Sequence, residues 1–193
     1  MSDRVTKYAA VQVGERLYQG EIVEGLIQVR QTLETIGANG PLRLDEIAHP
    51  FAIVMTQDCD LEQDFCLRSG GHEGPSRLAN ILFCEAIATT DLKAKVPQGK
   101  DIWKRVIQNK DERYQCLESV PPNQDLLGAG IACLGCDFKR YFTVPPDEVY
   151  RRIELRQIRR RTRLVTPYAE HLLSRFCVFQ SRVPLPENHE VPL

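Results

Sequence analysis

Hydrophobic residues occur along this chain in short runs, separated by polar stretches and by turns that contain Gly or Pro. Short apolar runs bounded by such breakers, and rich in β-branched or aromatic residues, are typical of strands inside a sheet. The pattern predicts strands at 18–30, 51–57, 81–88, 114–120 and 138–144. The run that follows Pro50 is the strongest candidate for a central strand, and 42–47 is expected to be a short extended piece. In all, we expect five to seven short strands.

Helical spacing is clearest near the C-terminus of the sequence. Apolar residues recur at helical spacing over 168–176, which predicts one amphipathic helix. Thr166 suits the N-cap of this helix, and Pro167 suits its first position because the proline ring fixes a helical φ. Shorter helical segments are predicted at 101–109 and 145–153.

The order of these elements bears on the fold class. Helices do not alternate regularly with strands, which argues against a doubly wound α/β fold. We expect a mainly β, α+β fold, built as a small curled antiparallel sheet or SH3-like barrel with a C-terminal helix. The chain then divides into a β-rich domain over 1–165, a helix packed on it over 166–183, and a Pro-rich tail over 184–193.

Composition limits the class of protein. Of the 193 residues, 42% are hydrophobic, so the chain can bury a core and is not of the disordered class. Lys and Arg number 25 against 26 Asp and Glu, so contact with nucleic acid has to come from a local patch. The longest apolar run, 51–55, is too short for a membrane helix, and the N-terminus carries no secretory signal. We therefore expect a cytoplasmic protein without a membrane contact, whose seven scattered cysteines stay reduced.

Polar residues directly after the predicted central strand form the first candidate site. Asp58, Cys59 and Asp60 would lie at the rigid end of a strand, where sites are often built. In an extended chain, the carboxylates spaced by two would share one face; they are Asp58, Asp60, Glu62 and Asp64. Three interpretations stay open: a structural turn, a metal or ligand site, and a nucleophilic Cys59 activated by a histidine.

Cys133 and Cys136 form the only C-x-x-C motif of the sequence. A structural zinc site usually takes four ligands from two such pairs, so this pair would need His72, Cys84 or Cys116 to approach it in space. A redox pair would start a helix, whereas the residues that follow favour a strand. A zinc-stabilised domain, a redox pair and a plain tight turn therefore remain alternatives.

An arginine-rich stretch is the strongest charge feature of the chain. Seven arginines occur between 151 and 163, and arginine suits nucleic acid because it pairs bidentately with phosphate and stacks on bases. The candidate nucleic-acid contacts are Arg156, Arg159, Arg160, Arg161 and Arg163. Alternatively, the arginines form a solvated face or pair with the acidic segment 58–64 or with a protein partner.

Some segments resemble known families. The strand end T-Q-x-C-D-L at 56–61, together with 161–186, resembles bacterial families without an assigned activity. Distantly, 20–22 and 50–54 are similar to the G-[ED]-I and P-x-[AV]-[IV]-V strands of PemK/MazF-like toxins, which implies a small SH3-like barrel. Those toxins place an arginine for RNA cleavage before the proline, where this chain has His49. If His49 takes the place of that arginine, the resemblance implies that it acts as an acid or a base. The toxins also have a Ser or Thr at a later position, to which Thr89 or Thr90 would correspond.

These features together predict a non-catalytic bacterial interaction protein. It would bind nucleic acid or a protein partner through the arginine-rich stretch, in a toxin–antitoxin or defence setting. One alternative is a metal-dependent nuclease-like hydrolase that uses Asp58 and Asp60, with Cys59 and His49 as further catalytic candidates. The other alternative is a small zinc-stabilised domain that uses the C-x-x-C motif.

Overall fold

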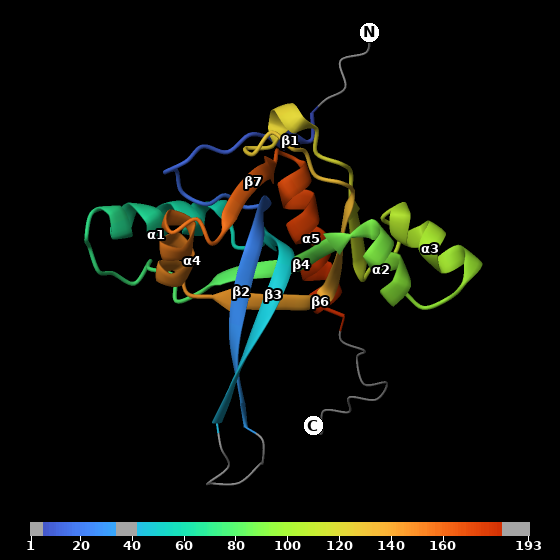
Figure 1. Cartoon of the computed structure of the whole chain (residues 1–193), viewed down its shortest axis with the longest axis horizontal. Helices are drawn as coiled ribbons and strands as arrows, with labels where there is room; N and C mark the ends of the chain where they lie inside the picture. The colour runs from blue at the N-terminus through green and yellow to red at the C-terminus, as the bar shows by residue number, and fades with distance from the viewer. Residues whose placement is uncertain (1–5, 34–41, 183–193) are drawn as a thin grey trace, which may run out of the picture.

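A computed structural model describes residues 6–33 and 42–182 of the chain. In it, the strands form one antiparallel sheet in the order β1-β7-β2-β3-β4-β6-β5 (Figure 1). Their bounds are β1 Tyr8–Ala9, β2 Glu21–Leu33, β3 Leu42–Val54, β4 Ile81–Ala88, β5 Tyr114–Leu117, β6 Leu134–Val144 and β7 Arg159–Leu164. The sheet is open, with β1 at one edge and β5 at the other. The predicted α+β class is confirmed, as an open sheet rather than a closed barrel.

Helices lie on both faces of the sheet. Their bounds are α1 Asp58–Ser69, α2 Thr89–Lys95, α3 Lys100–Ile107, α4 Pro146–Glu154 and α5 Tyr168–Gln180, with a 3-10 turn η1 at Pro122–Gln124. Helix α5 packs in one apolar cluster with the sheet, whereas α1 and α4 pack in another. Helices α2 and α3 stand together beside β5 and β6 (Figure 1). The C-terminal helix is therefore present as predicted and packs on the sheet.

The continuous apolar run that begins at Phe51 lies in β3, a strand whose two faces are both covered. Ala52 and Val54 belong to the cluster that contains α1 and α4, whereas Ile53 belongs to the cluster that contains α5. Successive side chains of a strand point to opposite faces, and both faces are covered here. Burial of each large apolar side chain stabilises the fold by about 1.5–3 kcal/mol, so every position of this run favours the fold.

Strands β2 and β3 continue beyond the sheet as a two-stranded ribbon (Figure 1). Strand β4 pairs with β3 only from Phe51 to Val54, while β2 pairs with β3 from Ile53 back to Leu42. The sequence predicted two pieces where β3 is one strand. Pro50 is tolerated inside β3 because it lies outside the stretch that pairs with β4. A turn expected at 36–41 lies outside the described residues.

The segment after β3 corrects one prediction. The extended chain expected there is wrong, because α1 begins at Asp58. Asp58 and Asp60 lie in the first turn, where the helix dipole favours negative charge. Leu61 and Asp64 are the buried positions of this helix. Positions two apart diverge by about 200° around a helix, so the expected single acidic face does not form.

The remaining helices agree with the predictions in part. The segments expected to be helical near 101–109 and 145–153 correspond to α3 and α4, whereas α2 has no counterpart among the predictions. Thr166 does not cap α5; its hydroxyl donates to the Glu170 carboxylate at 2.8 Å instead. The Pro-rich tail at 184–193 lies outside the described residues. None of the helices described is both long and apolar enough to cross a membrane.

Candidate functional site

Much of the arginine-rich stretch is used inside the protein. The Arg160 side chain is 4% exposed, and its Nε and Nη2 donate to the Glu21 carboxylate at 2.6 and 2.9 Å. Its other donors reach the backbone carbonyls of Gln12, Glu15 and Arg16 at 2.8–2.9 Å. Arg160 therefore holds the segment before β2 on the sheet and has no donor left for a phosphate.

Arg161 is committed to a second internal network. Its guanidinium forms a bidentate pair with Asp125 at 2.8 and 2.7 Å, donates to the Gly130 carbonyl at 3.0 Å, and also contacts Glu24. The bond from Arg161 lowers the pKa of Asp125 and, reciprocally, raises the pKa of Arg161. Arg159 pairs with Glu24 as well. The predicted pairing of arginines with carboxylates is thus present, but the partners are not those of segment 58–64.

Two of the candidate arginines remain without such partners. Arg156 is exposed, follows α4 with a left-handed φ of 58°, and its side chain forms none of the hydrogen bonds or ion pairs of the described residues. The same holds for the side chain of Arg163, which is half-buried at the end of β7. The Arg163 guanidinium carbon lies 4.2 Å from the centre of the Tyr18 ring. Arg163 therefore lies over the Tyr18 ring, while its donors form no hydrogen bond within the described residues.

Asp58 lies beside this stack. Arg16 covers Tyr18 with a guanidinium carbon also 4.2 Å from the ring centre, and it donates to both oxygens of Asp58 at 2.9 and 2.6 Å. The backbone N–H of Gln19 donates to Asp58 at 3.2 Å, and the Gln19 side chain accepts from the Asp58 N–H at 3.2 Å. The bond from Arg16 lowers the pKa of Asp58, and the charge of Arg163 acts in the same direction. These contacts attach the start of α1 to the loop before β2.

A groove runs between the start of α1 and helix α5, and we call it the α1–α5 groove. It consists of two adjoining hollows of about 360 and 430 Å³ that share Gln19, Asp58 and Glu170. The first hollow also contains Arg163, and the second contains Leu173. The structure therefore brings together the segment after β3 and the end of the arginine-rich stretch, which contain two of the candidate sites predicted from the sequence.

Two more residues of the T-Q-x-C-D-L segment, Gln57 and Cys59, line this groove. Cys59 lines the second hollow and is exposed, as is Cys177 on the opposite helix. Among the described residues, the Cys59 thiol donates hydrogen bonds to the side chains of Gln57 and Asp60, each at 3.8 Å. None of the groove-lining residues in the described chain is a histidine. The groove therefore does not supply the base that the nucleophile hypothesis for Cys59 requires.

His49 lies elsewhere, on β3. It is buried, stacks on Phe142 with ring centroids 3.8 Å apart, and its Nδ1 lies 3.2 Å from Glu85. Burial raises the pKa of Glu85, but the hydrogen bonds from His49 and Arg140 outweigh it and lower the pKa to about 2. The Nε2 atom of His49 is buried and has no partner in the described chain. His49 and the carboxylates at 58 and 60 are therefore parts of different regions.

The two cysteines of the C-x-x-C motif differ in exposure. Cys133 precedes β6 and is exposed, whereas Cys136 is buried in the cluster of α5 beside Cys84. A hydrogen bond with Cys84 and burial raise the pKa of Cys136. No group of three or more His, Cys, Asp or Glu residues suited to a metal ion occurs in the described parts of the chain. Neither the zinc hypothesis nor the metal-dependent nuclease hypothesis gains support from these positions.

Sequence reasoning missed most of the groove. Tyr18, Gln19 and Glu170 carry no motif, and Arg16 lies in a stretch without a periodic pattern. The one signal in the sequence is that Arg16 and Tyr18 lie two residues apart, which makes a cation–π contact with the Tyr18 ring possible. Comparison with protein families, with curated proteins and with solved structures finds no match for this chain.

Proposed function

We propose that the protein is a non-catalytic binding protein whose α1–α5 groove takes a small zwitterion, of the class of α-amino acids with an apolar side chain. The observation that carries this proposal is Arg163, a half-buried guanidinium stacked on Tyr18 whose donors are unbonded within the described chain. It shares a hollow of about 360 Å³ with the carboxylate of Glu170. Within the described residues, one hollow of the groove thus contains an unpaired cation, Arg163, and the carboxylate of Glu170.

Arg163 supports the binding of a carboxylate. A guanidinium presents its N–H donors in a planar fork that matches a carboxylate, and such charge-assisted pairs are stronger than neutral hydrogen bonds. Stacking on Tyr18 restricts the side chain before any ligand arrives. Less rotamer freedom is then lost on binding, which favours affinity.

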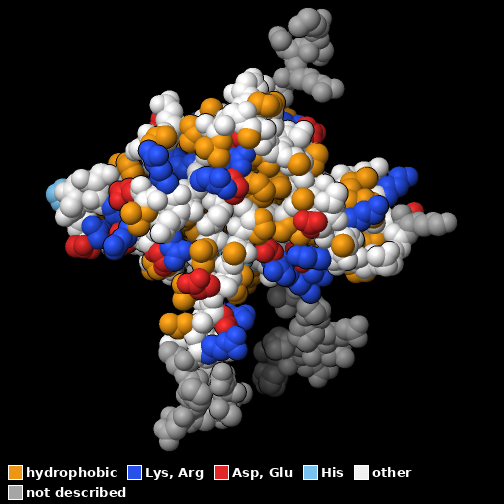
Figure 2. Space-filling view, viewed as in Figure 1, with side chains coloured by type: hydrophobic (Ala, Val, Ile, Leu, Met, Phe, Trp, Pro, Cys, Tyr) orange, Lys and Arg blue, Asp and Glu red, His pale blue; other side chains and the backbone are white. Residues whose placement is uncertain are grey.

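The carboxylates of the groove support an ammonium group on the same ligand. Glu170 is exposed and accepts one hydrogen bond, from Thr166, so its other oxygen is available. Asp58 already accepts three bonds from Arg16 and Gln19 and contributes negative charge. These acidic groups would repel a phosphate backbone, which makes nucleic acid the poorer fit. The face drawn in Figure 2 agrees, because basic side chains there are interspersed with acidic ones.

The second hollow supports an apolar side chain on the ligand. Leu173 and the thiols of Cys59 and Cys177 line it, together with Ser174. We favour binding over catalysis because both carboxylate oxygens of Asp58 already accept hydrogen bonds from Arg16. A carboxylate held in this way is a poor general base, since its pKa is lowered.

The test is isothermal titration calorimetry of the full chain with L-leucine. N-acetyl-leucine lacks the ammonium and leucinamide lacks the carboxylate, so each is expected to bind at least about tenfold more weakly, as loss of one charge-assisted bond of about 1.5–3 kcal/mol implies. Arg163→Met is expected to weaken L-leucine binding at least about tenfold. The matched control is Arg156→Met, which removes another unpaired arginine outside the groove and leaves binding unchanged.

Three results would overturn the proposal. The first is the absence of heat and of amide NMR shifts with millimolar L-leucine, and the second is equal binding of L-leucine by the Arg163→Met variant. The third is tight binding of a single-stranded oligonucleotide that falls steeply with salt and is lost in Arg163→Met. That third result would identify the end of the arginine-rich stretch as a nucleic-acid contact instead.

A further inference from the structure

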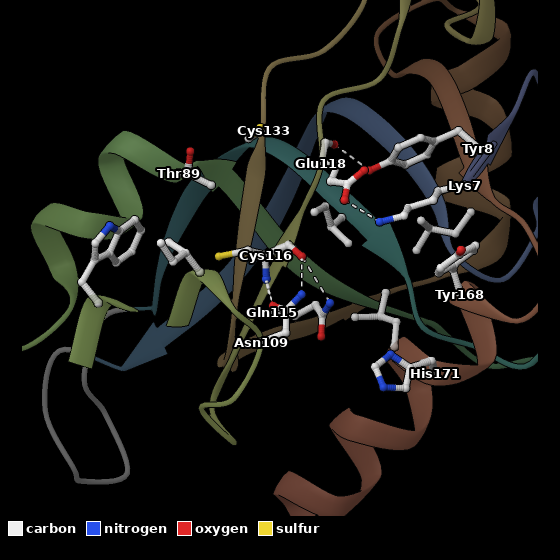
Figure 3. A pocket seen from close by; sticks show the side chains of 15 residues that line it. Lys7, Tyr8, Thr89, Asn109, Gln115, Cys116, Glu118, Cys133, Tyr168 and His171 are labelled. Atoms are coloured by element: carbon white, nitrogen blue, oxygen red, sulfur yellow. Dashed lines mark hydrogen bonds and ion pairs between the residues drawn. The ribbon is translucent and has the colours of Figure 1, made fainter. Parts of the chain in front are cut away.

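A second cavity lies at the β5 edge of the sheet, away from the proposed groove. Its volume is about 420 Å³, within the range of small-molecule sites. Side chains from β5, α3, α5 and the segment before β1 line it (Figure 3). It shares only Leu164 with the α1–α5 groove.

Two large aromatic side chains from different helices line this cavity. Trp103 comes from α3 and Tyr168 from α5, and Cys116 of β5 lines the cavity as well. Ile107 and Leu172 add apolar surface. A lining of aromatic rings and aliphatic side chains favours a flat apolar molecule, because aromatic groups bury large areas and stack offset or edge to face.

The polar groups of the cavity are mostly engaged with one another. The Asn109 side chain accepts from the backbone N–H of Cys116 at 2.6 Å and donates to its carbonyl at 3.0 Å. Lys7 forms an ion pair with Glu118, and the Tyr8 hydroxyl donates to the Glu118 carbonyl at 2.7 Å. Asn109 thus covers the open edge of β5 in the manner of a neighbouring strand. A strand-like peptide would have to displace it.

The charge inside the cavity is balanced. Lys7 and Glu118 neutralise each other, so neither calls for a charged ligand. Burial raises the pKa of the Cys116 thiol to about 11, so this central side chain stays protonated and uncharged at neutral pH. A charged ligand would lose hydration here without gaining an unpaired partner.

We infer that this cavity is a second binding site, for a neutral planar aromatic small molecule that packs on its aromatic and aliphatic lining. The aromatic lining from Trp103 and Tyr168 gives the shape of the ligand, and the closed Lys7–Glu118 pair gives its lack of charge. The polar edge groups that remain, among them Thr89 and His171, would orient a hydroxyl or amine on the ring.

The test uses the single tryptophan of the chain as its reporter. N-phenyl-1-naphthylamine is a neutral aromatic probe that fluoresces in apolar surroundings and accepts excitation energy from tryptophan. Titration into the full-length protein is expected to give saturable probe emission with energy transfer from Trp103. Anilinonaphthalene sulfonate, a similar ring system with a negative charge, is expected to bind at least about tenfold more weakly.

A matched pair of variants locates the probe. Cys133 is exposed and lines the cavity, so Cys133→Phe fills it and is expected to weaken probe binding at least about tenfold. Cys66 is exposed on α1 and lines neither the cavity nor the groove, so Cys66→Phe leaves binding unchanged. Thermal unfolding of both variants checks that they are folded.

The proposal is overturned by emission that does not saturate, by equal binding of the anionic probe, or by equal binding to the two cysteine variants. A peptide ending in an aromatic residue that competes with the probe more strongly than free indole would also overturn it. In that case the cavity would receive a side chain of a partner protein. L-leucine binding in the groove is independent of all these outcomes.

Discussion

The buried pair of Arg160 and Glu21 allows the sharpest test of how the arginine-rich stretch is used. The change is Arg160→Met, which keeps the length of the side chain but removes its charge and its donors. Glu21 would then stay fully buried with only the Tyr18 N–H as a partner, at 3.0 Å. Three backbone carbonyls that now accept from Arg160 would lose that donor.

The magnitude follows from this geometry. Removing one partner of a buried ion pair typically lowers the free energy of unfolding by about 3–5 kcal/mol, because a charge is left buried and uncompensated. For a chain of this size, that lowers the midpoint of thermal unfolding by roughly 6–20 °C. Arg156 is exposed and pairs with none of the described residues, so its truncation is expected to cost less than about 0.5 kcal/mol.

The loss should also depend on pH. Burial raises the pKa of Glu21, while the bonds from Arg160 and Tyr18 act in the opposite direction. Without Arg160, the pKa of Glu21 rises further above its unfolded value. Above about pH 5, Glu21 ionises in the unfolded chain but resists ionisation in the folded variant, which favours unfolding. The loss of unfolding free energy in Arg160→Met therefore grows as pH rises above about 5.

The assay is urea unfolding of Arg160→Met and wild type at pH 5 and pH 8, with the double variant Glu21→Leu/Arg160→Met beside them. The double variant should recover part of the loss, because it no longer buries an unpaired carboxylate. A single-variant loss below about 1 kcal/mol would refute the reasoning, since this value is far below that for a broken buried pair. So would a double variant no more stable than the single one.

Two further predictions concern other polar side chains that form hydrogen bonds inside the fold. Glu85, with a pKa of about 2, stabilises the fold above its unfolded pKa by up to about 3 kcal/mol; this contribution is lost as pH falls from about 5 to 2. Glu85→Gln should therefore flatten the acid limb of stability measured by urea unfolding against pH. Asn109→Gly keeps the left-handed φ of 56° but loses both bonds to Cys116, so calorimetry should show a loss of about 1–3 kcal/mol. An unchanged midpoint would mean that solvent replaces those bonds.

The pattern of apolar residues along the chain was sufficient to predict those elements whose apolar side chains are buried against other elements. Strand β4 was predicted as 81–88 and has those bounds, because its apolar residues are buried on both faces of the sheet. The C-terminal helix was predicted because its apolar spacing follows the face that packs on the sheet. The class of fold followed from the order of such elements.

Local pattern failed where two structures fit the same residues. The chain after β3 alternates carboxylates with other residues, which suits an extended face. Burial of Leu61 against the sheet and the attachment of Asp58 to Arg16 and Gln19 favour the helix instead. Both contacts come from residues distant in sequence, so no window along the chain contains them.

The amino-acid sequence by itself therefore determined the class of fold, the central strand and the last helix, because these depend on periodic burial. Only the tertiary structure decided how the arginines are used. Arg160 finds Glu21 and Arg161 finds Asp125 across gaps of 139 and 36 residues, while Arg163 is left stacked on Tyr18. Arginines in one strand look alike in the sequence. Which of them is buried, paired or free depends on strand register and on the loops that cover each face, and these are set by the packing of the whole chain.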